Sequence, residues 1–142
     1  MDEKQLMEQF DKLNRRMRRY FDSFFAGMPL TSVQALTLQY VLVESEKRDV
    51  FQKDLEEFLE IKGSSVTSLL NNLERNGYLR REPLAEDARY KRLVPTKEAY
   101  SLRGEVDRRV MAYMHGVFAG LGEEELACFQ SVVERMSQNA SK

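Results

Sequence analysis

The fold is indicated by residues 52–77, which read QKDLEEFLEIKGSSVTSLLNNLERNG. Apolar residues recur at helical spacing from Leu55 to Leu59 and again from Val66 to Leu73, with Gly63 between the two runs. Asn76-Gly77 follows the second run, where a left-handed C-terminal cap ends a helix. Two short helices joined by a glycine-containing turn form a helix-turn-helix.

The second of these helices has no charged residue from Gly63 to Leu73, although 32% of the chain is charged. Ser, Thr and Asn are poorer helix formers than the Glu, Lys and Arg typical of a purely solvated face. Their hydroxyl and carboxamide groups suit base edges and phosphates, and Asn can bond bidentately to adenine. A neutral helix packed against its own protein is the alternative interpretation. The residues that we expect to contact DNA here are Lys62, Ser64, Ser65, Thr67, Ser68, Asn71, Asn72 and Arg75. We also expect Ser64 or Ser65 to cap the start of this helix.

The pattern then changes to two short runs compatible with β-strands, Tyr78–Glu82 and Lys91–Val94, joined by a polar loop of about eight residues. This predicts a hairpin, which must rest on the helices before it because an isolated two-stranded hairpin is marginal in water.

Positive charge is concentrated around this hairpin. The whole chain has 22 Lys and Arg against 23 Asp and Glu, but residues 75–97 contain seven basic and three acidic residues. We expect Arg89 to enter a minor groove, with Asp87 orienting its guanidinium and Lys91 and Arg92 lying over phosphates. A solvated turn with no binding role is the alternative.

Long apolar stripes flank this core on both sides. One runs from Leu6 to Phe24, and others run from Leu102 to Leu121 and from Leu126 to Met136. Thr31 and Gln34 have capping-box spacing, and Thr96 is placed to cap the helix after the hairpin. Because a monomer would expose the stripes, we expect them to form a subunit interface. The expected interface residues are Leu6, Phe10, Leu13, Val117, Leu121, Phe129, Val133 and Met136.

The chain therefore predicts a mainly α-helical winged helix-turn-helix with a small β-hairpin wing and N- and C-terminal dimerisation helices. We expect a single domain over residues 1–142. Its winged core covers about 31–97, and its dimerisation helices cover about 3–27 and 97–138.

The run Leu73-Glu74-Arg75-Asn76-Gly77 together with Asp87-Ala88-Arg89 resembles the winged helix-turn-helix of MarR-type bacterial transcription regulators. The resemblance spans about residues 31–99. It implies a homodimeric repressor on a pseudo-palindromic operator in double-stranded DNA, with the helix from Ser64 to Arg75 in the major groove and the Arg89 wing in the minor groove. Many members release DNA when a small, often phenolic, ligand binds, so the resemblance also implies a small amphipathic effector as a partner. Pro95 and Ala99 depart from the common pattern, where Leu and Gly are usual.

Other functions are disfavoured by what the chain contains. One cysteine, Cys128, and one histidine, His115, cannot supply a Cys/His zinc site or an internal disulfide. No catalytic constellation or phosphate loop is visible, so we expect no enzyme and no cofactor. We interpret Cys128 as a packing residue and His115 as an ordinary helix residue. No stretch is apolar enough for a membrane span, and we expect a cytoplasmic protein. The main competing hypothesis is a dimeric helical interaction module whose winged helix no longer binds DNA.

Overall fold

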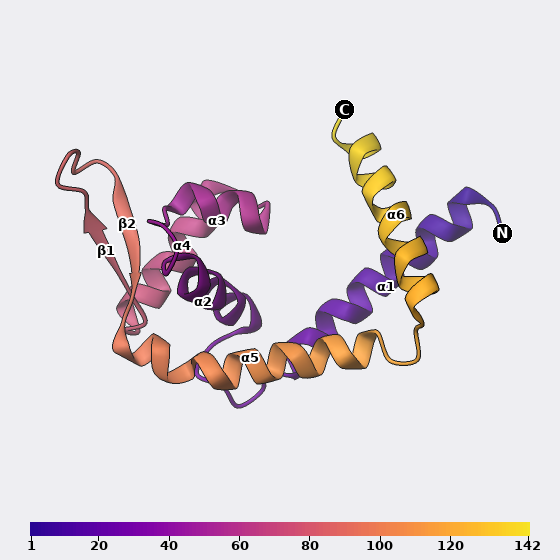
Figure 1. Ribbon diagram of the computed structural model, residues 1–142, viewed down its shortest axis with the longest axis horizontal. Helices are drawn as coiled ribbons and strands as arrows, with labels where there is room; N and C mark the ends of the chain where they lie inside the picture. Colours follow the sequence, from indigo (N-terminus) through magenta and orange to yellow (C-terminus); the bar gives the residue numbers. More distant parts are fainter.

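The computed structural model describes residues 1–142 as six helices and one antiparallel hairpin (Figure 1). Their bounds are α1 Glu3–Ser23, α2 Ser32–Glu44, α3 Gln52–Leu59, α4 Gly63–Arg75, β1 Leu79–Pro83, β2 Lys91–Pro95, α5 Lys97–Val117 and α6 Glu123–Ala140. The predicted order of elements and the mainly α-helical class are confirmed.

Local hydrogen bonds explain where several helices begin. The Thr31 hydroxyl accepts the Gln34 N–H at 3.2 Å, and the Gln34 side chain accepts the Thr31 N–H at 2.9 Å, which is the expected capping box. The Thr96 hydroxyl likewise accepts the Ala99 N–H at 3.3 Å. Gly77 has a positive φ of 84°, which fits the left-handed position expected after α4.

The predicted serine cap of α4 is wrong. The N-cap is Lys62, whose carbonyl accepts the N–H groups of Ser65 and Val66 at 3.0 and 3.1 Å, and no side chain caps the helix. Ser64 and Ser65 are therefore already inside the first turn, with both residues exposed. Gly63, the first residue of α4, also allows α3 to lie close by, because a Cβ there would lie 2.9 Å from a Glu56 carboxylate oxygen.

The hydrophobic core lies in the winged part of the molecule. Sixteen apolar residues form it, mostly from α2 to α5, and both strands contribute, through Leu79 and Leu93. The strands pair in the register Leu79↔Pro95 and Arg81↔Leu93. The Leu93 N–H also donates to the Val50 carbonyl at 2.7 Å, so the hairpin is anchored to the segment before α3.

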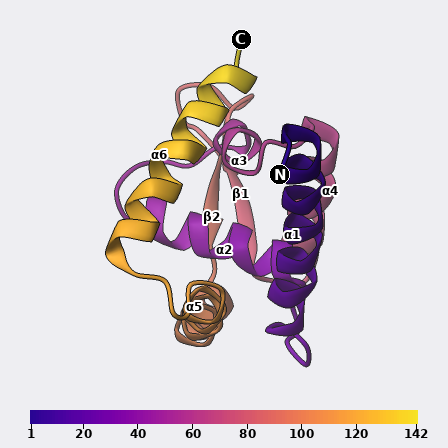
Figure 2. The ribbon, with the colours of Figure 1, turned by 90° about the vertical axis from the view of Figure 1, so that its right-hand side faces the viewer.

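Helix α6 stands apart from this core, and α1 reaches it only near its C-terminal end, where Phe21 packs against it. Neither contains a buried residue, and they leave the far end of α5 as separate arms (Figures 1 and 2). The expected buried face of α6 is exposed within one chain, with Phe129 49% exposed, because α6 packs on little of its own polypeptide. None of the six helices combines the length and the apolar character that a membrane span requires.

Candidate nucleic-acid interface

Helix α4 presents an uncharged polar face to solvent and an apolar face to the core. Val66, Leu70 and Leu73 are buried, so the opposite side of the helix is directed outward. Among the residues expected to contact DNA, those exposed on or next to α4 are Lys62, Ser64, Ser65, Ser68, Asn71 and Arg75. The structure thus brings most of the predicted recognition residues onto one accessible surface.

Two of the expected contact residues lie toward the protein. The Thr67 hydroxyl donates to the Gly63 carbonyl at 2.9 Å and accepts from the Gln52 side-chain amide at 2.9 Å. Asn72 is half-buried. Thr67 therefore joins α4 to α3. Sequence periodicity placed it only at the flank of the polar face and did not show that its hydroxyl was already bonded.

The loop over residues 84–90 carries an internally oriented arginine. Arg89 Nε and Nη2 donate to the Asp87 carboxylate at 3.0 and 2.7 Å, and the Arg89 backbone N–H donates to Asp87 Oδ1 at 3.1 Å. The Arg89 side chain is 84% exposed. Its hydrogen bonds hold the pKa of the Asp87 carboxyl below the ordinary value. Asp87 thus orients the guanidinium as expected.

The remaining wing cations point in different directions. Lys91 and Arg92 are consecutive on β2, so their side chains leave opposite faces of the hairpin. Arg92 lies 3.7 Å from an Asp49 oxygen and 3.8 Å from a Glu82 oxygen. Lys91 instead lines a surface hollow with Arg89, so the two cations do not share one binding direction.

This hollow, of about 250 Å³, lies between the start of α3 and the wing. Its cationic lining residues are Lys53, Arg81, Arg89 and Lys91, and no carboxylate lines it. Because Lys53 and Lys91 line it together with two arginines, the hollow is a positively charged surface suited to a phosphate group. Sequence reasoning missed Lys53 and Arg81. Lys53 lies in the first turn of α3, and a basic residue there could have been recognised in the sequence as a candidate phosphate contact. The position of Arg81 depends on strand register, which the sequence does not show.

Arg81 connects the hairpin to α4. Its backbone N–H donates to one Glu74 carboxylate oxygen at 3.0 Å, and its Nη2 donates to the other at 3.0 Å. The same Nη2 donates to Asn71 Oδ1 at 2.5 Å. These bonds hold the pKa of Glu74 below its ordinary value, with the Arg81 side chain as the main cause. The wing and the exposed face of α4 are therefore one continuous surface.

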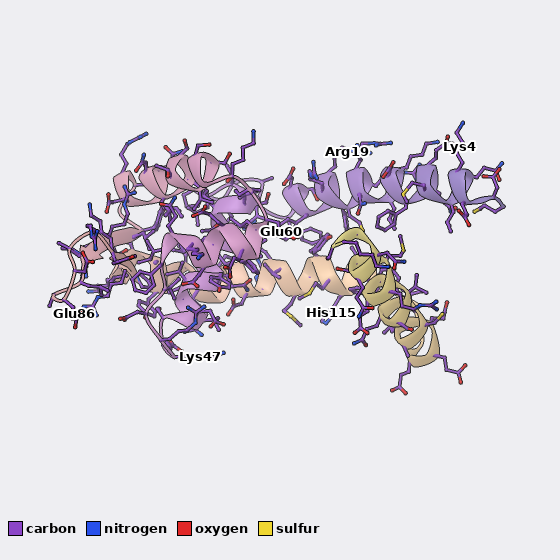
Figure 3. The ribbon with its side chains drawn as sticks, turned by 90° about the horizontal axis from the view of Figure 1, so that it is seen from above. Lys4, Arg19, Lys47, Glu60, Glu86 and His115 are labelled. Carbon is purple, nitrogen blue, oxygen red and sulfur yellow. The ribbon has the colours of Figure 1, made fainter.

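Several residues outside this surface are exposed to solvent. Cys128 is exposed on α6, which extends away from the core, so it makes no packing contact inside its own chain, and a packing role would require a second copy. His115 is also exposed, near the end of α5. The labelled Lys4 and Arg19 point into solvent from α1, while Glu86 lies at the outer end of the hairpin loop (Figure 3).

Comparison with known proteins agrees with this architecture. The sequence profile of the MarR family matches residues 26–89. An uncharacterised HTH-type transcriptional regulator of Bacillus subtilis (strain 168), YwoH, is 28% identical over 87 residues, which cover 61% of this chain. The match spans 63% of the length of that curated relative.

Solved structures resemble nearly the whole chain. The transcription regulator MarR from Oenococcus oeni is 28% identical, with a TM-score of 0.77 over 94% of this chain and 98% of that one. MepR of S. aureus, solved as a DNA complex, has the same fold, with a TM-score of 0.84 at 23% identity over 94% of this chain and 96% of that one. The profile match over residues 26–89, the 28% identity to the Oenococcus oeni regulator and the winged helix-turn-helix between long flanking helices make this chain similar to MarR-family regulators.

Proposed function

We propose that the protein is a sequence-specific regulator that binds double-stranded DNA and acts as a homodimeric repressor on a pseudo-palindromic operator. The observation that carries this proposal is the continuous surface formed by the exposed face of α4 and the wing. Arg81 contacts Asn71 on α4 and also lines the cationic hollow beside Arg89, so groove-reading and phosphate-binding groups are adjacent. The fold shared with MepR of S. aureus, which was solved with DNA, supports the same use.

Homodimer formation is proposed from the exposed apolar residues of the terminal helices. The exposed large side chains there include Leu6, Phe10, Leu13, Leu121, Phe129, Val133 and Met136, while Val117 is half-buried. Solvent exposure of so many apolar groups on two helices is unfavourable in a monomer. A twofold pairing would cover them and would place two copies of α4 about 34 Å apart, one turn of DNA.

A small amphipathic effector is proposed for an apolar hollow of about 510 Å³ between α1, α2 and α5. Phe21, Val110 and Tyr113 supply much of its apolar lining, and Arg18 and Asp22 supply charge. Its size and mixed lining suit a ring compound with one polar group. Because the hollow joins α1 and α5 to α2 of the winged core, we expect an occupant to alter how these helices pack and thereby to change DNA binding.

Selection of bound duplexes from a random pool, followed by gel-shift titration of the selected duplex, tests the proposal. We expect a palindromic sequence bound with two copies of the chain, and weaker binding as salt rises. Failure to enrich any duplex would contradict DNA binding and would favour a helical interaction module. Enrichment of a non-palindromic site by a monomer would contradict the symmetric arrangement.

A further inference from the structure

The hydrogen bond between Arg81 and Asn71 determines which way the Asn71 carboxamide faces. A guanidinium group only donates hydrogen bonds, so it must meet the oxygen of the amide and not its nitrogen. Because Arg81 Nη2 lies 2.5 Å from Asn71 Oδ1, the Nδ2 group is turned away from the hairpin. The two amide orientations, which are otherwise nearly equivalent, are thus distinguished by a neighbouring side chain.

Arg81 is itself held in place and cannot readily follow a rotating amide. Its side chain is 24% exposed, and Glu74 accepts from both its guanidinium and its backbone N–H. Asn71 and Glu74 are three residues apart, so they are neighbours on one face of α4. The carboxylate therefore anchors the guanidinium, and the guanidinium in turn orients the exposed Asn71.

This orientation changes what Asn71 offers to a base. The bidentate contact with adenine requires the amide oxygen to accept from N6 while the amide nitrogen donates to N7. With Oδ1 directed toward Arg81, Asn71 offers N–H donors to a groove. In the major groove, guanine O6 and N7, thymine O4 and adenine N7 accept hydrogen bonds, whereas adenine N6 and cytosine N4 donate them. Adenine N7 lies beside the N6 donor, which an amide nitrogen cannot pair, so a donor-only Asn71 is matched best by guanine or thymine.

We infer that Arg81 is a positioning residue that makes Asn71 select guanine or thymine over adenine and cytosine in the DNA target. This inference rests on the proposed DNA-binding function and narrows it to the bases read at one position. It replaces the adenine contact that the sequence alone suggested for an asparagine on a recognition helix.

The test uses the full chain and a duplex selected by the wild-type protein. The position read by Asn71 is the one whose base preference disappears in Asn71→Ala. Duplexes with each of the four bases at that position are then titrated with the wild-type protein, together with 7-deazaguanine where guanine is selected. We expect guanine or thymine to bind at least about fivefold more tightly than adenine. Replacing guanine with 7-deazaguanine, which lacks the N7 acceptor, should weaken binding of the duplex by the wild-type protein but not by Asn71→Ala.

Variants of Arg81 separate positioning from simple charge. In Arg81→Met the amide is free to turn, so discrimination against adenine should fall to about one or invert. In Arg81→Lys it should be retained because an ammonium group is also only a donor. Arg80→Met is the matched control. It removes the same charge from the adjacent exposed residue of β1, whose side chain makes no hydrogen bond or ion pair, so it should leave the base ratio unchanged.

The outcomes distinguish this inference from the proposed function. A wild-type preference for adenine or cytosine, an unchanged base ratio in Arg81→Met, or no altered position in Asn71→Ala overturns the role of Arg81 while DNA binding stands. If circular dichroism shows that Arg81→Met does not fold, the wild-type titration tests the inference alone. A preference for guanine or thymine then supports it, and a preference for adenine or cytosine overturns it. A protein that selects no duplex overturns the proposed function, and this assignment with it.

Discussion

Arg89 and Asp87 show how a single pair of residues sets the chemistry of the wing tip. A freely rotating arginine would lose considerable side-chain entropy on entering a groove. The bonds to Asp87 restrict the Arg89 guanidinium before any ligand arrives, and the side chain remains exposed. The pair thereby lowers the entropic cost of a minor-groove contact, although it also reduces the net positive charge of the tip.

Replacement of Arg89 with Ala should weaken binding to many sequences and reduce the salt dependence by about one unit of slope, because one phosphate-region cation is lost. Gel-shift titration at several salt concentrations measures both quantities. Arg108→Ala is the control, since it removes an exposed arginine from α5. Equal affinity and equal slope for Arg89→Ala and wild type would show that the wing does not contact DNA.

Glu105 should make folding stability depend on acid. Hydrogen bonds from Arg108 and then Arg109 lower its pKa from 4.5 to about 2. A carboxyl group with a lowered pKa in the folded state contributes stability above its unfolded pKa and loses it as pH falls. We expect the urea midpoint to fall between about pH 4.5 and 2, and to fall less in Glu105→Gln. The same fall of the urea midpoint between pH 4.5 and 2 in both proteins would contradict an ion pair of Glu105 with Arg108 and Arg109 in the folded state.

At the scale of elements, helices α1 and α5 are joined by close and specific contacts. Tyr20 packs edge-on against Phe24, with ring centroids 5.0 Å apart, and lies 5.7 Å from the Tyr113 ring. Arg109 Nη1 donates to the Phe24 carbonyl at 2.7 Å, which satisfies the C-terminal end of α1. Gly116 permits the approach, since a Cβ there would collide with the Tyr20 hydroxyl.

Two glycines in α5 should respond differently to the same substitution. Gly104→Ala should stabilise the protein by about 0.5–1 kcal/mol, because a helix-interior glycine is replaced where nothing lies within 4 Å. Gly116→Ala should gain nothing or lose stability, because Tyr20 must leave its place beside Tyr113. Denaturant unfolding compares the two variants. An equal gain in the free energy of unfolding for Gly116→Ala and Gly104→Ala would show that the contact between Gly116 and Tyr20 does not contribute to stability.

At the scale of the whole molecule, the apolar residues fall into two groups, a buried core and the exposed faces of the helices α1 and α6. The core side chains belong to the winged part, whereas α1 and α6 bury none of their residues (Figure 2). An arrangement of this kind is expected for a protomer whose arms pair with a second copy.

Phe129→Glu should therefore dissociate the proposed dimer and abolish tight operator binding, while the winged core stays folded. Sedimentation at micromolar concentration and circular dichroism give the two readouts. Glu134→Lys is a control on the same helix, where the native residue bonds only to Gln130. A wild-type protein that sediments as a stable monomer would exclude the dimer.

Much of the fold followed from patterns within a few residues. The capping box at Thr31 and the glycine after α4 depend on neighbours along the chain, and both were predicted correctly. The serine cap was wrong because the first turn of α4 already starts at Lys62 and Gly63, and a cap preference of Ser does not specify which of several neighbouring residues occupies the N-cap position. Cys128 is exposed in the single chain because α6 has few partners within its own polypeptide, which no local pattern could indicate.

The sequence by itself determined the elements and the chemical character of the α4 face and the wing, because helical periodicity, caps and charge distribution are local properties. Only the tertiary structure decided how these groups meet. The bond from Arg81 to Asn71, the use of the Thr67 hydroxyl by Gln52 and the place of Lys53 beside the wing all join separate elements. Burial of residues such as Leu70, Leu79 and Leu93 sets those elements against one another, and no local pattern specifies which polar groups that packing brings within bonding distance.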